Sequence, residues 1–109
     1  MQGAVAYASG GIGLDEANAI RQVAVQYPLE LEFARAATSQ NEYVSDVRVL
    51  IKNQEGKAVL NTTADGPFLL AKLSAGKYTV SIDRQGDTKQ RVVRIKPHRH
   101  EQLIFAWQK

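Results

Sequence analysis

The two histidines are the residues whose type and spacing could do chemistry. His98 and His100 are separated by one residue, so on a strand both imidazoles would face the same side, as metal ligands do. A stable metal site needs a third or fourth ligand, and the sequence has no other histidine and no cysteine. Pro97 precedes them and indicates a turn, where histidine is an ordinary solvated residue. We therefore predict no metal and no cofactor.

The basic residues around the histidines form the densest positive stretch of the chain. If Val93 and Ile95 face the core, alternation turns Arg94 and Lys96 toward water and Arg91 toward the inner side. Such charges on an outer strand can prevent edge-to-edge aggregation without binding anything. They can also meet an acidic partner or lipid headgroups, whereas nucleic acid is not expected because no aromatic platform accompanies them. The candidate interaction surface consists of Arg94, Lys96, His98, Arg99 and His100.

A glycine-rich stretch, Gly10-Gly11-x-Gly13, precedes a predicted helix, and free N–H groups at helix N-termini can hold anions. It follows no predicted strand and lacks both dinucleotide-binding spacing and the lysine–hydroxyl ending of a P-loop. Asp15 and Glu16 would also repel phosphate at this point. We predict no nucleotide site, and we assign residues 1–13 to a flexible leader.

The composition is that of one globular domain, with 109 residues, 44% of them hydrophobic. The absence of cysteine excludes disulfides, thiolate metal sites and thiol catalysis, and no apolar run is long enough to span a bilayer. Residues 1–46 carry a net charge of −4 and residues 47–109 carry +7. This asymmetry is typical either of a polyanion site or of two faces that attract each other.

Hydrophobic periodicity changes once along the chain. A helix of about residues 14–27 is predicted from one apolar stripe, and Pro28 should end it. Beyond Pro28 the hydrophobic period becomes two residues. Apolar and polar residues alternate within seven short stretches, which are separated by turns. We predict a mostly β fold: a seven-stranded antiparallel two-sheet sandwich with one short N-terminal amphipathic helix, forming a single domain over residues 14–109 with the sandwich at 29–109. The stripe consists of Ala17, Ile20, Val23, Ala24 and Tyr27.

The spacing Gly66-x-Phe68-x-Leu70-x-x-Leu73-x-x-Gly76-x-Tyr78-x-Val80 resembles that of the carboxypeptidase regulatory-like domains, which have the transthyretin (prealbumin) fold. The resemblance covers about residues 47–95 and implies that Phe68 and Leu70 enter the sandwich core. Ser74-Ala75 stands where that family often has prolines, and the helix is not part of its usual module. With the glycine-rich start and the terminal Phe105-Ala106-Trp107, the chain also looks like small exported proteins of Gram-negative bacteria.

No constellation of catalytic residues is evident, so we predict that the protein is not an enzyme. Transthyretin-like hydrolases share the fold that the resemblance implies. They end in a Tyr-Arg-Gly-Ser tail, which this chain lacks. The leading hypothesis is a non-catalytic binding or scaffold module of the bacterial envelope, periplasmic or secreted, with an unknown protein or glycan partner. The alternatives are a small-molecule or carbohydrate-binding module, using Tyr43, Tyr78 or Trp107, and a hydrolase of the transthyretin-like type.

Overall fold

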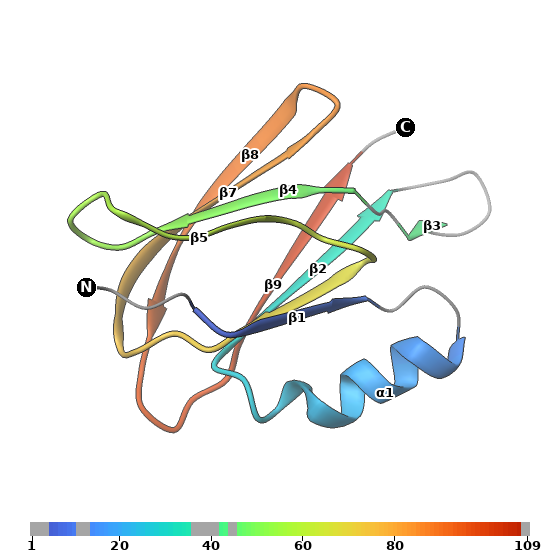
Figure 1. The fold of residues 1–109 in the computed structure, drawn as a ribbon, viewed down its shortest axis with the longest axis horizontal. Coiled ribbons are helices and arrows are strands. Elements are labelled where there is room, and N and C mark those ends of the chain that lie inside the picture. Colours follow the sequence, from blue (N-terminus) through green and yellow to red (C-terminus); the bar gives the residue numbers. More distant parts are fainter. Residues whose placement is uncertain (1–4, 11–13, 36–41, 44–45, 108–109) are drawn as a thin grey trace.

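The computed structural model describes residues 5–10, 14–35, 42–43 and 46–107. Within these ranges the chain is mostly β, with one helix and nine strands that form two packed sheets (Figure 1). The elements follow in the order β1 (Tyr7–Gly10), α1 (Leu14–Ala24), β2 (Leu29–Arg35), β3 (Glu42–Tyr43), β4 (Arg48–Lys52), β5 (Ala58–Thr63), β6 (Phe68–Ala71), β7 (Gly76–Arg84), β8 (Asp87–Ile95) and β9 (Glu101–Trp107).

Strand pairing divides the elements into a five-stranded and a four-stranded sheet. In the first, β6 lies between β1 and β2, and β2 also pairs with β3 and β9. The second has the order β5-β4-β7-β8. The prediction of seven strands is wrong because β1, within the predicted leader, and β3, at the end of a predicted loop, add two more. The prediction of antiparallel pairing is wrong at one place, since β2 and β9 are parallel along their whole lengths. Side-chain alternation is the same in both pairings and therefore does not reveal strand direction.

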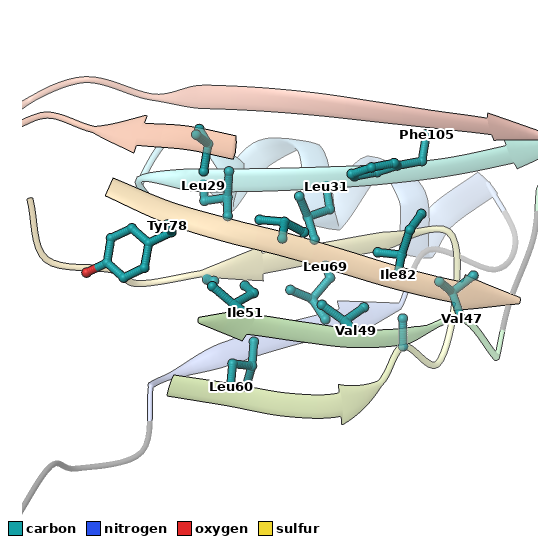
Figure 2. Close-up of a cluster of buried hydrophobic side chains, with 14 of the residues drawn as sticks. Leu29, Leu31, Val47, Val49, Ile51, Leu60, Leu69, Tyr78, Ile82 and Phe105 are labelled. Carbon is teal, nitrogen blue, oxygen red and sulfur yellow. The ribbon is translucent and has the colours of Figure 1, made fainter. Parts of the chain in front are cut away.

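The main core fills the space between the two sheets, whose apolar side chains point toward each other (Figure 2). The aromatic rings of Phe33 on β2 and Phe105 on β9 stack with their centroids 6.2 Å apart, and Trp107 packs beside Phe33. The predicted alternation in β4, β7 and β8 is confirmed, and Trp107 belongs to the same core. The inward-facing residues of these three strands are Val49, Ile51, Tyr78, Val80, Ile82, Val93 and Ile95.

Strand β6 is buried on both faces, and this reverses one prediction. Leu69 and Ala71 enter the core between the sheets, whereas Phe68 and Leu70 pack against α1. The expectation that Phe68 and Leu70 enter the sandwich core is therefore wrong. All four residues are apolar, so alternation could not distinguish the two faces of the strand.

Helix α1 covers the outer face of the five-stranded sheet, lying beside β1 (Figure 1). Ala17, Ile20 and Ala24 are buried against β6, while Val23 is 38% exposed because it lies at the margin of the stripe. The helix ends at Ala24 rather than near Tyr27, and the chain then turns through hydrogen bonds from the amides of Gln26 and Tyr27 to the carbonyls of Val23 and Ala24 (2.9 Å each). Within the described ranges, no helix has both the length and the apolar character that a bilayer crossing requires.

Candidate functional site

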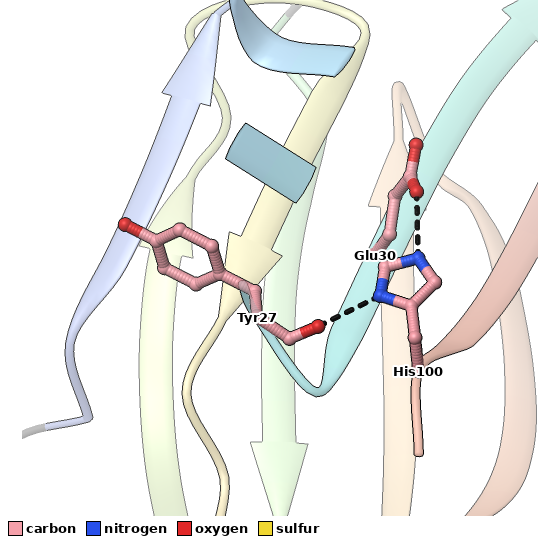
Figure 3. Close-up of polar contacts among 3 residues, drawn as sticks. All are labelled: Tyr27, Glu30 and His100. Atoms are coloured by element: carbon pink, nitrogen blue, oxygen red, sulfur yellow. Dashed lines mark hydrogen bonds and ion pairs between the residues drawn. The ribbon is translucent and has the colours of Figure 1, made fainter. Parts of the chain in front are cut away.

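His100 joins the start of β9 to two segments far away in the sequence (Figure 3). Its Nδ1 lies 2.8 Å from the carbonyl oxygen of Tyr27, in the turn between α1 and β2. Its Nε2 lies 3.0 Å from Oε1 of Glu30 on β2. The amide of Glu101 also donates to the carbonyl of Pro28 at 2.8 Å. A backbone hydrogen bond and the His100 side chain therefore both connect the start of β9 to the segment between α1 and β2.

The two contacts place specific demands on the ring nitrogens. A carbonyl oxygen only accepts hydrogen bonds, so Nδ1 of His100 must carry a proton to bond Tyr27. When Glu30 is ionised it also only accepts, so Nε2 must carry a second proton. The geometry therefore suits an imidazolium paired with a carboxylate whose side chain is only 8% exposed.

The two glutamates of β2 are not fully solvated. Glu30 is 6% exposed under the helix-covered side of the sheet, and Glu32 is partly buried two residues along the same face. Burial raises the pKa of Glu32 above its ordinary value, and the negative charge of Glu30 raises it further, while Arg21 on α1 opposes both. Both carboxylates lie on the side of the sheet against which α1 packs, because they pair in register with Leu70 and Phe68 of β6.

Replacing Glu32 with glutamine is expected to stabilise the fold at neutral pH by up to about 1 kcal/mol. A raised pKa in the folded state means that protonation favours folding; this contribution is complete below the unfolded pKa and is lost as pH rises through the folded pKa. The gain from Glu32→Gln should therefore shrink as the pH falls. Urea unfolding at a series of pH values measures it, with Glu55→Gln in an exposed turn as the control. A gain that does not vary with pH would contradict this account.

The outer face of the four-stranded sheet has no helix over it within the described ranges and carries basic side chains. We call Arg48, Lys52, Lys77 and Arg94 the open basic face. All four are exposed and alternate with core residues on β4, β7 and β8. Lys77 lies directly opposite Arg94 in the register of β7 and β8, and the same register places Arg48 opposite Asp83 across β4 and β7.

Two shallow depressions lie on this side of the sheet. One, of about 250 Å³, is lined by Arg48, Leu50, Asp83 and Thr88 among others, and the Thr88 hydroxyl donates to Asp83 at 2.9 Å. The other, of about 350 Å³, includes Lys52, Lys77 and the half-exposed Val92. The surface is therefore broad and contains both charged and apolar groups, because apolar side chains lie between the basic ones. Such a surface suits contact with another macromolecule better than enclosure of a small molecule.

The five residues of the predicted interaction surface do not share one environment. Arg94 lies on the open basic face beside Lys77, and Lys96, His98 and Arg99 are exposed around the β8–β9 turn. His100 instead reaches Glu30 and Tyr27, away from the exposed His98. No group of three metal-ligating side chains occurs in the part of the chain that the structure describes.

Sequence reasoning missed Arg48, Lys52 and Lys77 because they are far from the basic stretch along the chain. The one available signal was their alternation with core residues on three predicted strands, which places them outside the sheet. Strand order was also required, because only the β4-β7-β8 neighbourhood brings the charges together.

Two of the three aromatic residues proposed for a carbohydrate site are directed into the core. Tyr78 and Trp107 are buried in the main core, and the Tyr78 hydroxyl donates to the carbonyl of Ser74 at 2.9 Å. The side chain of Tyr43 lies outside the described part of the structure. As predicted, Arg91 is on the inner side of β8, where its guanidinium lies 5.4 Å from the centre of the Phe105 ring.

No protein-family model matches this sequence, and no curated protein matches it either. The functional argument therefore depends on the geometry of the described residues.

Proposed function

We propose that this protein is a non-catalytic binding or scaffold module whose open basic face docks an acidic protein surface. The observation that carries the proposal is the difference between the two sheets. Helix α1 covers the outer face of one, whereas the other presents Arg48, Lys52, Lys77 and Arg94 to solvent. Charge complementarity of this kind directs association and selects partners.

The chemistry of the face favours an acidic protein. Among the described outward-facing residues of β4, β5, β7 and β8, Asp83 is the only acidic one, and it accepts a hydrogen bond from Thr88. The exposed side chain of Val92 and the half-buried Leu50 lie between the cations and provide apolar contact. A protein surface combines carboxylates with apolar groups and can satisfy both.

We also propose that the module is of the carboxypeptidase regulatory-like, prealbumin-like type and works in the bacterial envelope. Two packed sheets and a β4–turn–β5 unit are compatible with this architecture. Osmotic-shock fractionation of cells carrying the native gene tests the compartment. The protein should be released with a periplasmic marker, and its retention with cytosolic markers would contradict the location.

The binding proposal can be tested with poly-L-glutamate as an acidic polypeptide probe. The double variant Lys77→Glu/Arg94→Glu should weaken binding by at least about tenfold at low salt, since it reverses two adjacent cations. The control Lys72→Glu/Arg99→Glu changes the net charge equally at exposed positions away from this face and should change affinity by about threefold or less. Isothermal titration calorimetry gives the affinities, and circular dichroism confirms folding.

Three results would overturn the binding proposal. The first is the absence of saturable binding by the unaltered protein. The second is an equal loss of affinity in both double variants, which would show that only net charge matters. The third is tighter binding of a sulfated glycan than of poly-L-glutamate, with the same sensitivity to Lys77→Glu/Arg94→Glu, which would assign the face to an acidic glycan.

A further inference from the structure

We propose that His100 is a pH-dependent latch that ties the β8–β9 turn to the α1–β2 turn when protonated and releases it when deprotonated. The inference is independent of the open basic face. It rests on the two contacts of the ring, to the carbonyl of Tyr27 and to the carboxylate of Glu30.

The latch works because both partners of the ring are acceptors when Glu30 is ionised. The imidazolium donates to both at once, whereas neutral imidazole has one N–H and can donate to only one. If the proton remains on Nδ1, the lone pair of Nε2 faces the Glu30 oxygen at 3.0 Å and repels it. If it remains on Nε2, the bond to the Tyr27 carbonyl is lost. Either way the neutral ring leaves one contact unsatisfied.

Because Glu30 is buried, loss of a contact of the His100 ring is expected to change the local structure. Glu30 is 6% exposed, so water cannot readily replace the lost partner, while the His100 side chain is 30% exposed and can swing outward. The amide of Glu101, next in the chain, begins the parallel pairing of β9 with β2 through its bond to Pro28. Release of His100 should therefore loosen the first residues of β9 before the rest of the sheet.

The charged groups around the latch come from several elements. Glu32 lies on the same face of β2 and interacts with Glu30 and with Arg21 from α1. Lys72, after β6, lies 5.5 Å from the centre of the Tyr27 ring, and Glu101 follows His100 directly. Of the two carboxylates on β2, Glu30 contacts the ring directly. Protonation of the ring therefore closes the latch, and deprotonation opens it.

Hydrogen exchange of the Glu101 amide tests the latch, expressed as a protection factor so that the intrinsic pH dependence of exchange is removed. In the unaltered protein the factor should fall by at least about tenfold between about pH 5.5 and about pH 8. His98→Asn, which removes the other histidine and tolerates the positive φ of 61° at that position, should show the same fall. His100→Gln should show low protection at both pH values.

Glu30→Gln gives the sharpest distinction, because its amide can donate to the lone pair of Nε2 while Nδ1–H still bonds Tyr27. The neutral ring then keeps both contacts, so protection should stay high at both pH values. Nitrogen NMR of the ring should place the proton on Nδ1 at alkaline pH in this variant. The proposal is overturned if the unaltered protein shows no fall, if Glu30→Gln retains the fall, or if the proton is found on Nε2.

Discussion

Replacing Phe105 with alanine is expected to lower the free energy of unfolding by about 3–5 kcal/mol. The ring is fully buried between the sheets, stacks on Phe33 and is covered by the guanidinium of Arg91. Its removal leaves a cavity at the parallel junction of β2 and β9, where the surrounding strands are fixed by their hydrogen bonds. Urea unfolding followed by circular dichroism measures the loss.

The adjacent residue provides the matched control. Ile104 lies on the same strand but is 50% exposed on the opposite face, so Ile104→Ala should cost about 1 kcal/mol or less. If Phe105→Ala is too unstable to purify, Phe105→Leu should still unfold at lower urea concentrations than Ile104→Ala. Equal losses at the two positions would contradict the burial of Phe105 in the main core.

The second large effect is expected from Gly66→Ala, at about 2–4 kcal/mol. A Cβ atom on Gly66 would lie 2.5 Å from the backbone carbon and oxygen of Gly10, at the end of β1. Backbone atoms cannot move aside without breaking the pairing of β1 with β6, whose last register pair is Gly10 with Phe68. The substitution should therefore displace β1 as well as destabilise the domain.

The amide of Lys72, which donates to the carbonyl of Ala6 at 2.9 Å, reports on the N-terminal approach to β1 by hydrogen exchange. Its protection should fall more in Gly66→Ala than in Gly56→Ala. Gly56 has a φ of +82°, but nothing lies within 4 Å of the place that an alanine methyl group would take, so its replacement should cost only about 1 kcal/mol of backbone strain. Unchanged protection of Lys72 in Gly66→Ala would show that β1 does not approach the β5–β6 turn so closely.

Much of the secondary structure could be predicted from local pattern. The alternation of Val49 and Ile51, and of Tyr78, Val80 and Ile82, identified β4 and β7 together with their buried faces. The helix was also predicted, although its end was placed about three residues too late. These features are local because the periods of two and 3.6 residues arise from backbone geometry within a single segment.

The candidate sites depended on contacts that no local pattern contains. His100 and Glu30 are 70 residues apart and meet only because β9 lies parallel to β2. Lys77 and Arg94 become neighbours through the register of β7 and β8. The close approach of Gly66 to Gly10 depends on the pairing of β1 with β6.

The sequence by itself therefore determined seven of the nine described strands, the position of the helix, and which side chains of most strands face inward. The tertiary structure alone decided that β6 is covered on both faces, that Glu30 is buried, and that one sheet face stays open and basic. The physical reason is that hydrophobic burial is specified residue by residue, whereas strand order, direction and coverage follow from how distant segments pack together.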